Sequence, residues 1–161
     1  MNEAITRFLE EQTCATICCL DEDGSPYCFS CYYVFNNEKD VLYFKSSPEA
    51  HHSALLKNKA GIAGTVLPDK LNKLITRGVQ LQGEVLQHLH PMAKDAYWTY
   101  HKKYPMALSI KGEVFTIQLT DIKLMDSKLG FGKKINWKRR EQAKEIADLS
   151  IESKLILKEK L

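Results

Sequence analysis

Long apolar runs are absent from this chain of 161 residues. Nowhere do about 18 apolar residues follow one another, the length that a membrane-spanning helix needs. The first eleven residues carry three glutamates and no apolar core, so they do not resemble a secretory signal. Charge of one sign is not in excess either, because the formal net charge is only +3. These absences predict a single-domain cytoplasmic protein without a membrane partner.

Several sequence motifs that are typical of catalytic, phosphate-binding or metal sites are also absent. No G-x-S-x-G segment marks a nucleophilic serine. Residues 130–133 (GFGK) match neither the phosphate-loop pattern nor G-x-G-x-x-G, and we interpret them as a loop. No metal site is predicted, because His51 and His52 diverge by about 100° on a helix and no carboxylate pattern supports His88 and His90. The catalytic residues are therefore unassigned.

The five cysteines are an odd number in a chain without a secretory signal, which argues against a disulfide framework. The segment Cys28-Phe29-Ser30-Cys31 spells C-x-x-C, but strand residues three apart face opposite sides of a sheet. We therefore expect structural, buried thiols at Cys14, Cys18, Cys19, Cys28 and Cys31. A metal-binding or redox pair within the C-x-x-C segment is the alternative.

Hydrophobic periodicity predicts a chain dominated by strands. Strand patterns cover residues 13–20, 27–35, 41–45, 60–67, 75–86 and 113–126, and helical patterns cover residues 3–12, 48–57 and 90–104. Asp23-Gly24 predicts a tight hairpin turn in which both residues have positive φ, and Asn36-Asn37 predicts another turn. Gly83, like Gly78, indicates a bulge or a close backbone approach. The predicted fold class is α+β: a mainly β, six-stranded antiparallel barrel with peripheral helices.

One junction has the chemistry of a phosphate site. Lys45, Ser46 and Ser47 precede a predicted helix start, where free N–H groups and a partial positive charge favour an anion. His51 and His52 follow in the first two turns and add further donors. The alternative is an ordinary serine–proline helix cap with surface histidines, which binds nothing.

The C-terminal part of the chain is basic. Residues 128–161 hold ten lysines and arginines against five acidic residues. We interpret residues 141–161 as a helical tail, packed on the domain or extending from it, with a solvated charged face. Nucleic-acid binding is the alternative, and it is disfavoured because acidic residues are interspersed and no arginine cluster stands beside aromatics.

Three stretches, in their order and spacing, resemble the FMN-binding split-barrel superfamily of pyridoxamine 5'-phosphate oxidase-like proteins, and within it the small YhbP-like branch. They read AGTV at 63–66, RGVQLQGE at 77–84 and LGFGKK at 129–134, the last followed by Trp137. His52, eleven residues before Ala63, also fits that branch. The resemblance covers about residues 1–140 and implies one split-barrel domain.

The resemblance implies a homodimer with FMN at the subunit interface. Its phosphate would be held by the end of the third strand and the following helix, the junction already singled out from its chemistry. The implied FMN-binding residues are Ser30, Tyr32, Lys45, Ser46, Ser47, His51, His52, Gln80, Lys133 and Trp137. Among them, Ser30, Tyr32 and Gln80 would line the ribityl chain and ring edge, and Lys133 and Trp137 would belong to a loop near the flavin.

The resemblance also implies a function. Pyridoxamine-phosphate oxidases themselves carry an R-x-V-L-L-K strand and a terminal R-L-H-D-R element, and both are absent from this chain. Pyridoxamine phosphate is therefore not the expected substrate. We expect an FMN-dependent oxidoreductase whose flavin transfers hydride to or from an unidentified small molecule. The alternative is a non-catalytic module that binds flavin, haem or another planar ligand.

Overall fold

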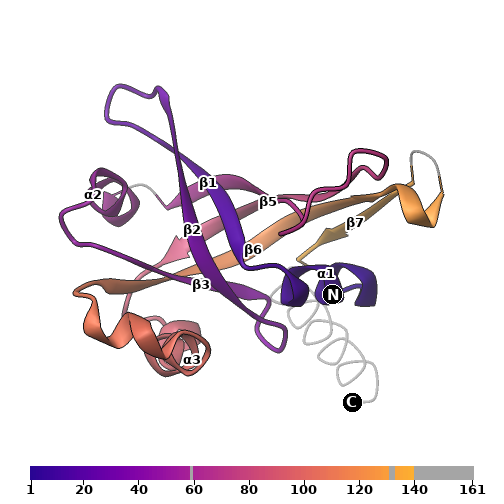
Figure 1. Ribbon diagram of the computed structural model, residues 1–161. Coiled ribbons are helices and arrows are strands. Elements are labelled where there is room, and N and C mark those ends of the chain that lie inside the picture. The colour runs from indigo at the N-terminus through magenta and orange to yellow at the C-terminus, as the bar shows by residue number, and fades with distance from the viewer. Residues whose placement is uncertain (59, 131–132, 140–161) are drawn as a thin grey trace, which may run out of the picture.

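A closed antiparallel barrel of six strands forms the body of the protein in a computed structural model that describes residues 1–58, 60–130 and 133–139 (Figure 1). The strands are β1 (Cys14–Leu20), β2 (Pro26–Asn36), β3 (Val41–Ser46), β4 (Gly61–Val66), β5 (Arg77–Leu86), β6 (Glu113–Asp126) and β7 (Lys134–Lys138). The sheet order is β3-β2-β1-β4-β5-β6-β7, and pairing of β3 with β6 closes the ring. The predicted fold class is confirmed.

The long strand β6 both closes the six-stranded barrel and pairs with a seventh strand that extends the sheet. Its first part, Glu113–Gln118, pairs with β3, and its second part, Asp121–Met125, pairs with β7. Strand β7 was not predicted, because its five residues (KINWK) directly follow a glycine-containing loop. The predicted tail, residues 141–161, lies outside the described residues.

The barrel interior is filled by the apolar residues of alternating strand positions. Ile17, Leu81, Leu119 and Ile122 are at most 2% exposed and belong to the main core. Helix α1 (Glu3–Glu11) adds Ile5, Phe8 and Leu9 to the same core. A smaller core under helix α3 (Ala96–Lys103) joins Val34, Val41, Tyr43, Ala96 and Tyr100. Burial of these side chains holds the strands, and so the site at their ends, in place.

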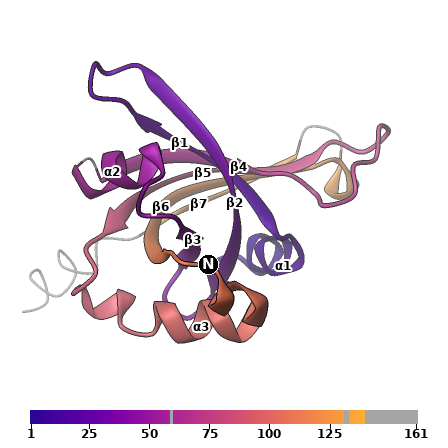
Figure 2. The ribbon, with the colours of Figure 1, turned by 60° about the vertical axis from the view of Figure 1, so that its left-hand side comes forward.

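Helices lie around the barrel, as Figure 2 shows for α1, α2 (His51–Asn58) and α3. The prediction of one helix over 90–104 was wrong, because a short 3-10 turn, η1 (Pro91–Ala93), precedes α3. Two further 3-10 segments, η2 (Pro105–Ser109) and η3 (Ser127–Leu129), flank β6. Within the described part of the chain, α1 is the longest helix at nine residues, and none has the length and apolar character needed to cross a membrane.

Two turns differ from their predicted form. The β1–β2 turn lies where predicted, but only Gly24 of the Asp23-Gly24 pair has positive φ, at 85°. Hydrogen bonds from Asp21 N to Ser25 O and from Gly24 N to Asp21 O enclose three residues instead of two. The helix expected from Pro48 begins later, at His51. There, Ser47 accepts from the Glu49 N–H and Ser53 donates to the Ser47 carbonyl, which stabilises a turn instead.

The cysteine prediction needs correction. Cys18 and Cys28 form a disulfide between β1 and β2, where the strand register places them directly opposite with Cα atoms 4.2 Å apart. Sequence spacing does not show this, because the register depends on the length of the turn. Cys19 is buried as expected, Cys31 is partly buried and Cys14 is exposed. Cys28 and Cys31 do face opposite sides of β2: Cys28 is exposed, and Cys31 packs against the main core.

The prediction for Gly83 is confirmed. The pairing of β5 with β6 shifts register between Gln82 and Gly83. A Cβ at Gly83 would lie 2.5 Å from the carbonyl oxygen of Gln118. The backbones therefore approach closely at this bulge, and only glycine fits.

Candidate functional site

A cluster of hydroxyls and one imidazole joins the end of β3 to helix α2. Ser46 Oγ lies 2.6 Å from Nε2 of His52. Ser53 is fully buried, and its hydroxyl donates to the Ser47 carbonyl at 2.7 Å and lies 3.2 Å from Ser46 Oγ. The predicted residues Ser46, Ser47 and His52 therefore meet in the structure.

The ring of His52 is fixed by an aromatic neighbour on β2. It stacks on Phe29 with ring centroids 3.7 Å apart and an interplanar angle of 6°. Burial, with a smaller contribution from His51, lowers the pKa of His52 below its ordinary value of 6.5. The imidazole is therefore neutral at pH 7, and its Nε2 serves as a hydrogen-bond partner without a charge.

His51 points to the β1–β2 hairpin instead of toward Ser46. Its Nε2 lies 2.8 Å from Asp21 Oδ2, and its ring meets Tyr27 edge-on at 5.0 Å. The two predicted histidines therefore have different partners. His51 contacts the β1–β2 hairpin, and His52 contacts Ser46.

The start of α2 has the elements of an anion site. The residue before the helix is Ala50, which has no side-chain acceptor to cap the first turn. The leading N–H groups of a helix have no partners within it and carry its partial positive charge. Together with the hydroxyls of Ser46 and Ser47 and Nε2 of His52, they form a set of mainly neutral donors. Such a set fits a phosphate without requiring a lysine or arginine.

Lys45 does not join this cluster. Side chains alternate along β3, and the Lys45 ammonium donates to the Ala107 carbonyl at 2.7 Å and lies 3.0 Å from His101 Nε2. His101 is 4% exposed, and its Nδ1 lies 2.8 Å from the Tyr97 carbonyl. In the structure, Lys45 anchors α3 and η2 to the barrel.

Replacing Lys45 by methionine is expected to lower the free energy of unfolding by about 1–3 kcal/mol, because a buried imidazole and a carbonyl lose their charged donor. Urea unfolding of K45M checks this. Lys111→Met is the control, because Lys111 is exposed just before β6. Equal stability of K45M and K111M would contradict the anchoring role.

The outer face of the barrel carries a row of polar residues across four strands. Ser30 pairs with Thr16, Thr16 with Thr65 and Thr65 with Gln80. The Thr16 and Ser30 hydroxyls are 3.2 Å apart. The predicted residues Ser30 and Gln80 therefore lie in one row, joined by two threonines that sequence reasoning missed. Tyr32 lies on the same face and is 63% exposed.

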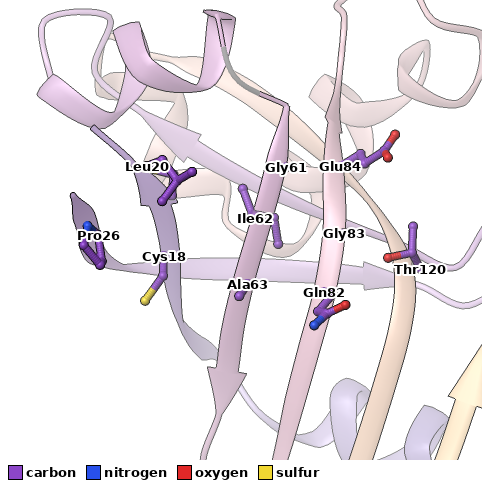
Figure 3. A pocket seen from close by; sticks show the side chains of 11 residues that line it. Cys18, Leu20, Pro26, Gly61, Ile62, Ala63, Gln82, Gly83, Glu84 and Thr120 are labelled. Atoms are coloured by element: carbon purple, nitrogen blue, oxygen red, sulfur yellow. The ribbon is translucent and has the colours of Figure 1, made fainter. Parts of the chain in front are cut away.

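Two shallow hollows flank this row. One of about 450 Å³ is lined by Tyr32, Thr16, Thr65 and Cys14, among others. The other, of about 580 Å³, lies over β1, β4 and β5, with Cys18, Ala63 and Gln82 side by side on neighbouring strands (Figure 3). Among the described residues that line it, the charged one is Glu84, whose carboxylate disfavours a phosphate. The small residues Gly61 and Ala63 leave room for a flat, uncharged group.

Lys133 and Trp137 lie far from the Ser46 cluster within one chain. Ser46 pairs with Glu113 at the start of β6, whereas Trp137 pairs with Ile122 nine residues further on. That separation is about 30 Å of strand. Trp137 packs against the main core, and Lys133 is exposed in the loop before β7. The structure does not bring these two residues to the Ser46 cluster. Trp137 lies closer to Gln80, because its partner Ile122 also pairs with Leu81.

The sequence profile of the pyridoxamine 5'-phosphate oxidase family matches residues 1–125. The chain belongs to this family. Its family relatives include the UPF0306 protein YhbP of Escherichia coli, 32% identical over 136 residues, which cover 84% of this chain and 92% of that protein. A UPF0306 protein of Photorhabdus laumondii is 30% identical over 137 residues, covering 85% and 95%. The predicted family and its YhbP-like branch are confirmed.

Solved structures share the fold of this oxidase-family chain at low sequence identity. A haem-binding protein from Mycobacterium smegmatis superposes with a TM-score of 0.69 at 13% identity, covering 86% of this chain and 59% of that one. An FAD-binding protein from Mesorhizobium loti gives a TM-score of 0.56 at 19% identity, covering 76% and 92%. These similarities concern the fold.

Sequence reasoning missed three residues of the cluster in this family member. Ser53 is buried in contact with Ser46, Phe29 stacks on His52, and Asp21 holds His51. Ser53 could have been found, because it lies on the helix next to the two histidines. Phe29 and Asp21 come from the β1–β2 hairpin, and their proximity depends on how that hairpin folds over α2.

Proposed function

We propose that the protein binds FMN, with its phosphate at the junction of β3 and α2. The observation that carries this proposal is the Ser46–His52–Ser53 cluster beside a helix start without a side-chain cap. Membership of the pyridoxamine 5'-phosphate oxidase family supports the choice of a flavin. An FAD-binding protein and a haem-binding protein share this fold, which supports the choice of a planar ligand.

The residues present fit a phosphate held by neutral donors. Ser46, Ser47 and the first N–H groups of α2 would donate to its oxygens, with His52 donating through Nε2 once it carries the proton. His51 is paired with Asp21 and would contribute indirectly, by placing the hairpin against the helix. We propose Ser30, Tyr32 and Gln80 for the ribityl chain and ring edge, because all three lie on the same outer face.

We also propose that the protein is a homodimer with FMN between subunits. In one chain, Trp137 is about 30 Å of strand away from the β6 residue that pairs with Ser46. We propose that Lys133 and Trp137 approach the FMN bound beside Ser46 of a second copy. The bound flavin would supply hydride transfer, and the protein would position it against a small substrate or electron donor. We therefore propose an oxidoreductase.

A second candidate is a non-catalytic module that binds haem or another planar ligand. The neutral imidazole of His52 favours it, because neutral histidine is a common metal ligand. Titration with haemin, followed by absorbance, separates this candidate from FMN binding.

FMN binding is expected to strengthen as the pH falls from 7.5 to about 6. His52 is neutral in the free protein because its pKa is lowered, and a phosphate dianion beside it would raise that pKa. Binding therefore takes up a proton between the two pKa values, and acidification favours the complex. Below the pKa of the free protein this gain ends, and the phosphate itself becomes a monoanion near its second pKa of about 6.

Fluorescence titration at several pH values measures the effect. His52→Asn keeps a hydrogen-bond donor but does not titrate, so its affinity is expected to lose this pH dependence. Affinity that does not change with pH in the unmodified protein, or an unchanged dependence in H52N, would contradict the assigned role of His52.

A further inference from the structure

The disulfide Cys18–Cys28 lies where the β1–β2 hairpin leaves the barrel. Among the described residues, strand β1 pairs with β4 through Thr16, Ile17 and Cys18, and beyond Cys18 it pairs with β2. Residues 19–27, which we call the hairpin arm, therefore extend past the last position held on both sides. Both ribbon views show this arm projecting on the same side as α2 (Figures 1 and 2).

The hairpin arm carries one wall of the candidate phosphate site. Its Asp21 holds His51 at 2.8 Å, and its Tyr27 meets the same ring at 5.0 Å. Phe29, the residue after Cys28, stacks on His52. The bond thus fixes the two strands directly next to the residues that orient both histidines.

The bond is open to small thiols from solvent. Cys28 is exposed, and Cys18 lines the open hollow of about 580 Å³ on the outer face (Figure 3). Exchange with the thiol of Cys31 is disfavoured, because Cys31 faces the opposite side of β2 and because burial, and to a lesser degree Cys14, raises its pKa to about 12. The attacking group in exchange is a thiolate, and Cys31 provides none near neutral pH.

We propose that Cys18–Cys28 is a reversible thiol–disulfide site that fastens the two strands at the base of the hairpin arm when oxidised, so that the arm keeps its contacts with α2, and loosens the arm when reduced. A thiolate of a small reducing thiol attacks Cys28 Sγ, forming a mixed disulfide while Cys18 leaves as a thiolate and takes up a proton. A second reducing thiol attacks the mixed disulfide, freeing Cys28. Two electrons and two protons pass to the cysteine pair, and the reductant becomes a disulfide.

Thiol counting tests the chemistry in the full chain without any ligand. The protein is denatured in N-ethylmaleimide and its intact mass is measured. Three of the five cysteines, those outside the bond, are expected to be labelled in the oxidised protein. All five are expected to be labelled after dithiothreitol, and three again after treatment with oxidised glutathione. Labelling of all five in protein treated with oxidised glutathione would overturn the proposal.

Cleavage after Glu22 tests the effect on the hairpin arm. A glutamate-specific protease is expected to cut this site about tenfold faster in the reduced protein, because a locally opened segment is the protease substrate. Cys14→Ser, on the same outer face but outside the bond, should respond to reductant like the unmodified protein. The pair Cys18→Ser and Cys28→Ser should be cut fast in both states. Equal cleavage rates in the oxidised and reduced unmodified protein would overturn the proposal without relying on a variant.

The link to the phosphate site rests on the proposed function and has its own readout. Reduction is expected to weaken FMN binding several-fold in the unmodified protein and in C14S. Equal FMN affinity in both redox states, with cleavage still redox-dependent, would overturn this link. FMN binding in neither state would contradict the proposed function, while the cleavage result would still decide the disulfide proposal.

Discussion

Replacing Ser46 and His52 together by alanine is expected to weaken FMN binding about 100-fold. Each side chain would lose a hydrogen bond to a charged phosphate oxygen, a contribution of about 1.5–3 kcal/mol. Two such losses amount to at least about 3 kcal/mol. Because roughly 1.4 kcal/mol corresponds to a tenfold change in affinity, this is about a 100-fold change. The measurement is a fluorescence titration of the double variant beside the unmodified protein at pH 7.

The matched control replaces a serine and a histidine away from the cluster, Ser109 and His88. Both are exposed. This double variant should bind FMN like the unmodified protein. Full FMN affinity in the Ser46→Ala, His52→Ala variant would show that the phosphate lies elsewhere, even if the protein is a flavoprotein. Circular dichroism of both variants establishes that a loss of binding is not a loss of fold.

Replacing Gly83 by valine is expected to lower the free energy of unfolding by about 3 kcal/mol. The new Cβ would lie 2.5 Å from the Gln118 carbonyl oxygen and 2.8 Å from a methyl of Ile117. The first contact is with backbone, which cannot move aside by changing rotamer. Relief therefore requires the β5–β6 pairing to separate at the bulge. Urea denaturation measures the change.

Gly61 provides the control for this prediction. It lies on β4, next to the residue that pairs with Gly83, and a Cβ there meets nothing within 4 Å. Gly61→Val is therefore expected to change the free energy of unfolding by no more than about 0.5 kcal/mol. If G83V and G61V lost a similar free energy of unfolding, the loss would come from replacing any strand glycine and not from the close backbone approach at the bulge.

The barrel was predictable from sequence because its strands follow a period of two and its turns carry turn residues. The pattern predicted residues 113–126 as a strand with both ends correct. It failed at the short strand β7, where five residues owe their conformation to pairing with β6. It also failed at Pro48, where hydroxyl bonds of Ser47 and Ser53 support a turn in place of helix.

The disulfide was missed because the length of the β1–β2 turn was predicted one residue too short. A two-residue turn at Asp23-Gly24 would place Cys28 opposite Cys19. The observed three-residue turn places it opposite Cys18 and moves the pair to the outer face. Because strand side chains alternate, one residue in a turn decides which thiols meet and whether solvent reaches them.

The candidate site was predictable where its residues are neighbours in sequence and not where folding brings them together. Ser46 and His52 are six residues apart, and the helix start between them has a recognisable chemistry. Lys45 was predicted beside them, but strand alternation turns its ammonium toward His101, fifty-six residues away in the chain. Thr16 and Thr65, which complete the outer polar row, depend on the sheet order.

Titration of the purified protein with FMN, combined with its mass in solution, tests the central claim most directly. The account predicts saturable binding of one FMN per chain of 18.4 kDa, with the chains paired as dimers. Flavin absorbance and quenched fluorescence report the binding, and light scattering reports the mass. A folded protein that shows no saturable FMN binding would contradict the account.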